Sequence, residues 1–215
     1  MKEIIKSSND YGRNKIKDNY EVVEFTEGAI NRLRDTLHKT VKRNSGHIDP
    51  ITVWKTVNDI ESDILGLKLS FDEAQGYERR KDFNSSAETY KRIGFVTRDL
   101  ANTYTKTPNM TIFREDVQKG QRSLIKDLTM ISKLLYIKAA EMYENEANAR
   151  IDRKKFDTAS EPMEEALLCL DSAKKSTRGY LAEPETYKGI ERLRERIEIK
   201  IKTLPKMIAL INTKR

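Results

Sequence analysis

Residues 80–88 read RKDFNSSAE, and residues 153–161, at an offset of 73, read RKKFDTASE. In each copy a charged stretch is followed by one phenylalanine, then by a Ser or Thr, and three residues after that by a Glu. This last spacing, from Ser85 to Glu88 and from Thr158 to Glu161, is that of a capping box, which marks the start of a helix. The echo therefore predicts two helix-turn-helix hairpins, each with its turn beside the repeated phenylalanine.

Apolar residues recur at three- and four-residue spacing on both sides of the two turns, and no segment alternates strongly enough to predict strands. The pattern predicts an all-α protein of about six helices in a bundle or hairpin array. The expected helices cover residues 26–44, 49–80, 85–104, 112–154, 158–175 and 184–205. Asp49-Pro50 and Glu183-Pro184 are start signals, since proline is tolerated in a first turn, and Pro205 is expected to end the last helix.

The expected helix over residues 112–154 is long for a globular protein, which indicates a bundle backbone or a contact between two copies of the chain. Gly120 is the point where this helix is expected to bend or break. Residues 1–20 lack periodicity and are expected to form a flexible arm. Residues 21–215 are expected to form one helical domain, with a sub-boundary near residues 106–111 left open.

The composition excludes several classes of protein. Hydrophobic residues make up 37% of the chain and are regularly spaced, which favours a folded core over disorder. No apolar run approaches the roughly 20 residues that cross a bilayer, and the N-terminus lacks an apolar signal core, so we expect a cytoplasmic protein. The one cysteine, Cys169, lies in an apolar run and is expected to be a buried small hydrophobe rather than a nucleophile.

Residues for catalysis are scarce. The chain has two histidines and no glycine cluster, so neither zinc spacing nor a phosphate-binding loop is present. A remote alternative is an all-α hydrolase in which glutamates gather magnesium. It requires convergence of glutamates from two helices: Glu141, Glu144, Glu161, Glu164 and Glu165. We otherwise expect no catalytic residue, cofactor or metal.

The formal charge of +7 is uneven along the chain: residues 1–50 carry +2, residues 51–183 carry none, and residues 184–215 carry +5. The last helix holds basic residues at four-residue spacing, and the first expected helix holds a second basic patch. These residues are Lys188, Arg192, Arg196 and Lys200, and Arg34, Lys39, Lys42 and Arg43. They are candidate phosphate contacts of a nucleic-acid-binding accessory protein. The competing interpretation is a salt-bridged exposed face. Nucleic-acid binding is favoured if both patches lie on one side of the fold.

Both copies of the echo resemble the tetratricopeptide-type helical hairpin, over roughly residues 64–100 and 137–173. The second copy matches that family's aromatic and small positions at Tyr143, Ala147, Phe156, Ala159 and Ala166. It departs from the family at Arg150, Lys154 and Asp171, and the first copy has Ser86 and Ile93 in place of two alanines. Two unrelated hairpins with similar turn chemistry are the alternative.

The resemblance implies a helical surface that binds another protein. We therefore expect a non-enzymatic interaction or adaptor protein, with self-association through the helix at 112–154 as a further expectation. The binding surface is expected on the second helix of the first copy, at Tyr90, Arg92 and Phe95.

Overall fold

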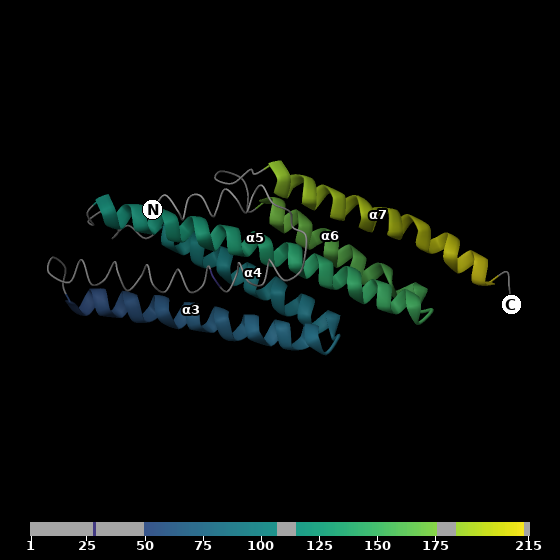
Figure 1. Ribbon diagram of the computed structural model, residues 1–215, viewed down its shortest axis with the longest axis horizontal. Helices are drawn as coiled ribbons and strands as arrows, with labels where there is room; N and C mark the ends of the chain where they lie inside the picture. Colours follow the sequence, from purple (N-terminus) through teal and green to yellow (C-terminus); the bar gives the residue numbers. More distant parts are fainter. Residues whose placement is uncertain (1–27, 29–49, 107–114, 176–183, 213–215) are drawn as a thin grey trace.

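A computed structural model describes residues 28, 50–106, 115–175 and 184–212, which form helices that pack side by side (Figure 1). The α-helices are α3 (Pro50–Arg79), α4 (Phe83–Lys106), α5 (Glu115–Asp152), α6 (Ser160–Lys175) and α7 (Pro184–Asn212). A 3-10 turn, η2 (Phe156–Thr158), precedes α6. No strand occurs in this part of the chain, so the all-α prediction is confirmed. The expected arm at 1–20 and, apart from residue 28, the expected helix at 26–44 lie outside the described residues.

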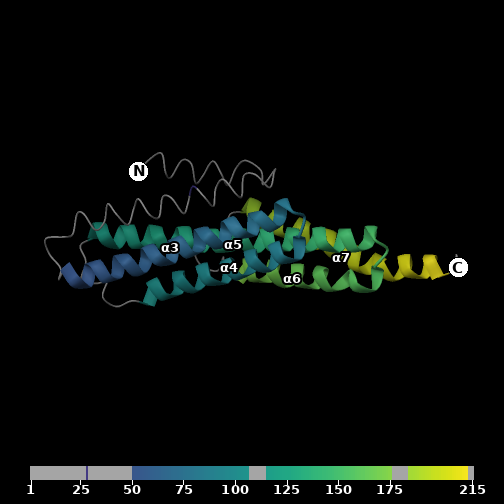
Figure 2. The same ribbon diagram turned by 90° about the horizontal axis from the view of Figure 1, so that it is seen from below.

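Successive helices pack against each other, so α3 and α4 form one hairpin, α5 and α6 form a second, and α7 follows. In Figure 2, α4 and α6 lie below α3 and α5, on one side of the molecule. Helix α5 packs against both α4 and α6 and is the centre of the array. Among the described residues, no helix combines the length and apolar character that crossing a membrane requires.

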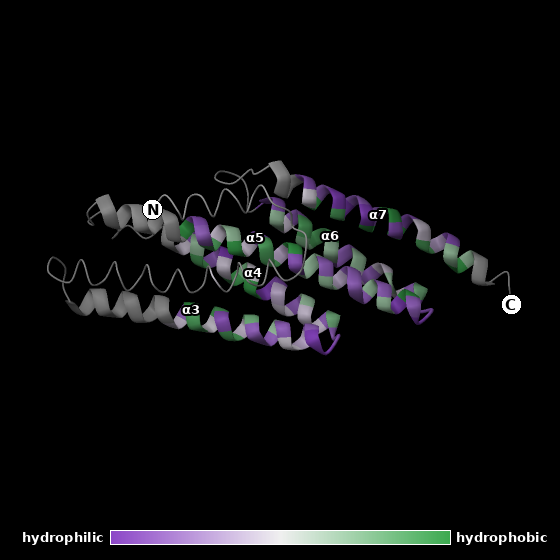
Figure 3. Ribbon diagram, viewed as in Figure 1, coloured by the Kyte–Doolittle hydropathy of each residue, from purple (hydrophilic) through white to green (hydrophobic). Residues whose placement is uncertain are grey.

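The middle of α5 forms the core of the protein. Every residue from 131 to 140 is buried. Along the coloured parts of the helices, α5 included, hydrophobic and hydrophilic residues are interspersed (Figure 3). Helix α5 runs through Gly120 without a break, contrary to the expectation that the helix could break there. Residues 73 positions apart in the two copies are equally buried: both members are buried in the pairs Ile64 and Ile137, Ala74 and Ala147, and Ser86 and Ala159.

The two hairpin turns have the same backbone geometry. In the first, the amide of Lys81 donates to the carbonyl of Glu78 at 2.9 Å, and that of Asp82 donates to Tyr77 at 3.0 Å. The second turn repeats both bonds 73 residues later, at 2.8 Å each. This pair of bonds is the Schellman helix end, whose left-handed residue is usually glycine. Here Lys81 and Lys154 occupy it, each with φ of 60°.

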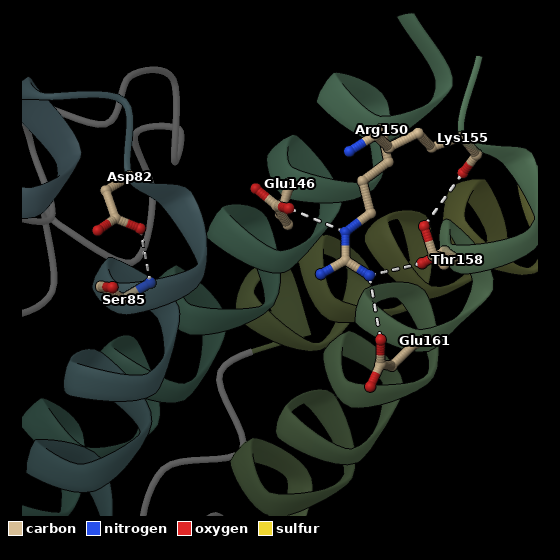
Figure 4. A network of polar contacts seen from close by, with 7 residues as sticks. All are labelled: Asp82, Ser85, Glu146, Arg150, Lys155, Thr158 and Glu161. Carbon is tan, nitrogen blue, oxygen red and sulfur yellow. Dashed lines mark hydrogen bonds and ion pairs between the residues drawn. The ribbon is translucent and has the colours of Figure 1, made fainter. Parts of the chain in front are cut away.

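The first predicted capping box is wrong. Helix α4 begins at Phe83, before Ser85, and the amide of Ser85 donates to the carboxylate of Asp82 at 3.2 Å (Figure 4). Asp82, already fixed by the turn, therefore caps the helix. Glu88 instead accepts a hydrogen bond from the Tyr143 hydroxyl on α5.

The side chains of the second capping box also serve other bonds. The Thr158 hydroxyl donates to the carbonyl of Lys155 at 3.3 Å, and Glu161 accepts from Arg150 at 3.0 Å. Arg150 also donates to the Thr158 carbonyl at 2.7 Å and to Glu146 at 2.9 Å (Figure 4). A guanidinium from the preceding helix thus closes this turn, and α6 begins at Ser160, two residues after the predicted start at 158.

Pro205 does not end the last helix, contrary to the sequence-based expectation, since α7 continues to Asn212. Proline removes one hydrogen bond from the helix interior and costs about 3 kcal/mol. The apolar stripe resumes around it, with Leu204 buried and Ile208 half-buried. Packing on both sides of the proline therefore offsets the loss.

We expect Lys154→Gly to stabilise the protein by about 0.5–1 kcal/mol, because glycine relieves a left-handed backbone that costs an L-residue about 1–2 kcal/mol. Urea unfolding followed by circular dichroism measures the change. Lys155→Gly is the matched control: its φ is −92°, so glycine there relieves nothing and lowers stability. A Lys154→Gly protein no more stable than the wild type would contradict the assignment.

Two glycines inside helices are expected to respond to alanine with opposite signs. A Cβ at Gly66 meets nothing within 4 Å, so Gly66→Ala is expected to stabilise α3 by about 0.5–1 kcal/mol. A Cβ at Gly94 lies 3.3 Å from the Ser132 carbonyl oxygen of α5, so Gly94→Ala is expected to destabilise by about 1 kcal/mol or more. Thermal unfolding of both variants tests the close approach of α4 to α5. If both melting temperatures shifted equally and in the same direction, the close approach would be refuted.

Candidate functional site

Large apolar side chains are exposed at three places: on α3, on α4 with α6, and on α7. Among the described side chains they are Leu65 and Leu69, Phe95, Val96 and Leu168, and Ile199 and Met207. Single exposed apolar residues are normal, so the informative feature is whether they gather.

One group lies on α4 and α6, which both pack against α5 and are joined by an ion pair. The Lys91 ammonium on α4 lies 2.8 Å from the Glu165 carboxylate on α6. Both helices run in the same direction, because α5 is antiparallel to each. Phe95 follows Lys91 by one turn and Leu168 follows Glu165 by one turn, so both lie at the same level. Phe95 is 54% and Leu168 57% exposed, and with Val96 we call them the seam patch.

The seam patch repeats with the hairpins, because Phe95 and Leu168 are themselves 73 residues apart. Each hairpin therefore exposes an apolar side chain at the same position of its second helix. The Arg98 guanidinium lies 5.4 Å from the centre of the Phe95 ring and 5.7 Å from that of Tyr136. Such cation–π contacts hold an exposed aromatic ring in place.

The three predicted interaction residues have different environments. Tyr90 is fully buried and donates to Glu78 at 3.1 Å, so it offers no surface to a partner. Burial, with the Glu78 carboxylate beside it, raises the pKa of the Tyr90 hydroxyl. Arg92 is exposed and pairs with Glu73 at 3.3 Å. Phe95 belongs to the seam patch.

The predicted basic ridge of α7 does not stay on one side of the helix. Each residue turns an α-helix by about 100°, so a row at four-residue spacing drifts by about 40° per step. Lys188 and Arg192 are exposed, and Arg196, which is also exposed, binds Glu144 on α5 together with the half-buried Lys200. Half of the ridge therefore serves the packing of α7.

Glu144 on α5 is the group that these two side chains bind. Its carboxylate, 6% exposed, lies 2.8 Å from Nε of Arg196 and 2.6 Å from Nζ of Lys200. The Lys200 ammonium also donates to Asn148 at 3.0 Å. Burial by itself raises the pKa of Glu144, but the hydrogen bonds from Arg196 and Lys200 outweigh it, and the pKa is lowered overall.

The other predicted basic patch, Arg34, Lys39, Lys42 and Arg43, lies outside the described residues. Whether it shares a side of the fold with α7 therefore stays a prediction. The same holds for nucleic-acid binding by the two patches together.

The glutamates of the metal hypothesis do not converge within the described part of the chain, where no three potential metal-binding side chains gather. Glu144 binds α7, Glu161 binds Arg150 and Glu165 binds Lys91, each already paired with a cation. Glu164 is exposed on α6. The convergence that a carboxylate metal site requires is not met among these residues.

A buried ion pair between α3 and α5 was not predicted from the sequence. The Lys138 side chain is 1% exposed, lies 2.8 Å from the Glu78 carboxylate and is 6.0 Å from the centre of the Tyr90 ring. A signal was present, since Lys138 interrupts an otherwise apolar run from 134 to 140. The pair joins α3 to α5 as Glu144 joins α7 to α5.

Two other sequence-based expectations concern the interior. Cys169 is buried beside the seam patch, and burial raises the pKa of its thiol to about 12, so it is protonated at neutral pH. This confirms the prediction of a buried small hydrophobe. Residues 131–140 of α5 are buried, and self-association through the helix expected at 112–154 stays a prediction.

The fold defines a class, that of all-α proteins built from consecutive antiparallel helices. A scan against protein-family models, a search of curated proteins and a search of solved structures each found no match to this chain.

Two carboxylates on one face of α5 are expected to respond oppositely to amidation. Glu144→Gln should cost about 2 kcal/mol at neutral pH, since it removes charged hydrogen bonds. Because the pKa of Glu144 is lowered in the folded protein, its contribution to stability is fully present above the ordinary glutamate pKa, near 4.3. This contribution is lost as the pH falls through the lowered pKa.

Burial raises the pKa of Glu141, so ionising it opposes folding, and Glu141→Gln should stabilise the protein at neutral pH with little effect in acid. Unfolding midpoints from pH 3 to 8 for both variants provide the measurement. Equal destabilisation by the two amides would show that these environments are misassigned.

Proposed function

We propose that this protein is a non-enzymatic helical adaptor of the cytosol that binds a protein partner across the α4–α6 surface. The observation that carries the proposal is the seam patch: Phe95 and Leu168 are more than half exposed at one level of two adjacent helices. Contiguous exposed apolar surface on a polar background marks interaction sites. Repetition of the position in both hairpins fits an array that presents one continuous surface.

The charges around the seam patch indicate the chemistry of the partner. Lys91 is paired with Glu165, and Arg92 with Glu73, so these side chains neutralise one another within the chain. A strongly charged partner therefore gains little here. The surface fits a protein segment that inserts apolar side chains between Phe95 and Leu168 and carries little net charge.

The resemblance to tetratricopeptide-type hairpins supports the same function, because such hairpins stack into surfaces that bind other proteins. The alternative is a nucleic-acid-binding accessory protein. It is less favoured because Glu144 already pairs with two of the four basic ridge residues on α7. It is kept as an outcome of the experiment.

We expect Phe95→Lys combined with Leu168→Lys to reduce capture of partner proteins at least about tenfold, the effect of removing an apolar hot spot. The immobilised full chain is incubated with nuclease-treated lysate of its source cells, and captured proteins are quantified by mass spectrometry. Ile199→Lys on α7 has similar exposure, 55%, and is the matched control that should retain capture.

Circular dichroism should show wild-type helicity for all variants, since the altered side chains are exposed. Equal capture by the double variant and the wild type would refute the seam patch as the binding surface. Capture of nothing above empty resin, or capture that nuclease treatment abolishes, would refute binding to a protein.

A further inference from the structure

The C-terminal end of α7 extends past the other described helices, as Figure 1 and Figure 2 both show. Its packing against the rest of the protein fades along the helix, because Ile197 and Leu204 are buried, Ile208 is half-buried and Ala209 is exposed. Four of the five residues from 205 to 209 are exposed, so this end of the helix is open to a binding partner.

The end of α7 is basic, and no acidic residue within it offsets the charge. Glu198 is the last acidic residue of the sequence, and residues 199–215 hold five basic residues, a formal side-chain charge of +5. Lys200 is already neutralised by Glu144, at 2.6 Å. Lys202 and Lys206 are exposed and form no ion pair with the described residues.

The neighbouring groups do not cancel this charge. Helix α7 packs against η2, so the second hairpin turn lies beside it. Residues 146–161, which include that turn, hold four basic and four acidic side chains and are neutral as a whole. Farther back on α7, the exposed Arg192 and Glu195 offset each other. The net positive charge therefore belongs to the end of α7 itself.

Apolar side chains are exposed on the same face as these lysines. Each residue turns the helix by about 100°, so Ile199, Lys206 and Met207 point away from the side that buries Leu204. Ile199 is 55% and Met207 37% exposed, and Lys202 lies at the edge of the face. The end of α7 thus combines uncompensated cations with exposed apolar side chains.

We infer that the end of α7 binds an anionic lipid surface, with Lys202 and Lys206 at the phosphates and Ile199 and Met207 below them. A basic amphipathic helix binds such a surface through two additive contributions, the burial of its apolar side chains and the attraction of its cations to anionic lipids. Lysine suits this position because its stem lies along apolar surface while its ammonium stays among the headgroups.

A nucleic acid fits this end of the helix less well. A phosphate backbone attracts the lysines but offers no apolar contact to Ile199 and Met207. Residues 199–212 also hold no aromatic side chain on which a base could stack.

An acidic protein partner is likewise less suited. The centres of protein interfaces favour aromatic residues and arginine and disfavour lysine. Residues 199–212 hold three lysines, no arginine and no aromatic residue. A lipid surface is the partner that uses both the lysines and the aliphatic side chains.

Co-sedimentation of the full chain with lipid vesicles tests the inference. Vesicles of phosphatidylcholine with about 30% phosphatidylserine should pellet the wild type at about 100 mM salt, and should pellet less of it at about 500 mM. Vesicles of phosphatidylcholine alone should leave the protein in the supernatant.

Two pairs of charge reversals separate a site from a general effect of charge. Lys202→Glu combined with Lys206→Glu should weaken binding to the anionic vesicles at least about a hundredfold, since each cation near the surface adds to the attraction. Lys68→Glu combined with Lys126→Glu is the matched control. These two lysines are exposed on α3 and α5, and their reversal changes the charge of the chain equally but should leave most of the binding.

A third variant tests the apolar contribution without changing the charge. Ile199→Gln combined with Met207→Gln should weaken binding to the anionic vesicles about tenfold or more. Circular dichroism should show wild-type helicity for all these variants, because every altered side chain is exposed.

Four results would overturn the inference. A wild type that stays in the supernatant with anionic vesicles would do so, as would duplex DNA binding without vesicle binding. Equal losses in the two lysine pairs would show attraction by net charge without a site. A glutamine variant that binds like the wild type would show attraction without apolar contact.

The outcome is independent of the proposed adaptor function. Partner capture depends on Phe95 and Leu168, whereas vesicle binding depends on Lys202, Lys206 and their apolar neighbours. Failure of one set of variants therefore leaves the result of the other unchanged.

Discussion

The burial of the middle of α5 is the constraint on which the rest of the structure depends. Ten consecutive buried residues, 131–140, demand a neighbour on every side, and polar groups among them need partners from those neighbours. The Ser132 hydroxyl donates to the Gly94 carbonyl of α4 at 2.7 Å, and Lys138 binds Glu78 of α3 at 2.8 Å. A buried polar group left without its hydrogen-bond partner costs about 1–3 kcal/mol, and the buried Lys138 charge costs more, so these bonds fix the register of both helices on α5.

Features encoded in local sequence could be predicted. Helices α3 to α7 follow from apolar spacing, from proline at two first turns and from the repeated turn, whose two copies share one backbone geometry. The capping boxes failed because Asp82 of the turn and Arg150 of the preceding helix supply the bonds instead. The prediction that Pro205 ends the last helix was wrong, because the burial of Leu204 against other helices cannot be recognised from the local sequence.

The surface was predictable only in part, because exposure depends on how helices are placed together. Phe95 was identified from its helix, but Leu168 lies in an apolar run that resembles core. The basic ridge of α7 was expected on one face, yet its four-residue spacing winds around the helix until Glu144 binds its second half. The Glu144 contact joins residues 52 and 56 positions apart, a relation that no periodicity contains.

The single cysteine has a practical consequence. Cys169 lies under the seam between the two hairpins, and its protonated, covered thiol is inert while α4 and α6 remain together. A thiol reagent therefore reaches it only when the helices separate. Its rate of labelling measures how often the hairpins open, so the chain carries its own reporter of local unfolding without any introduced probe.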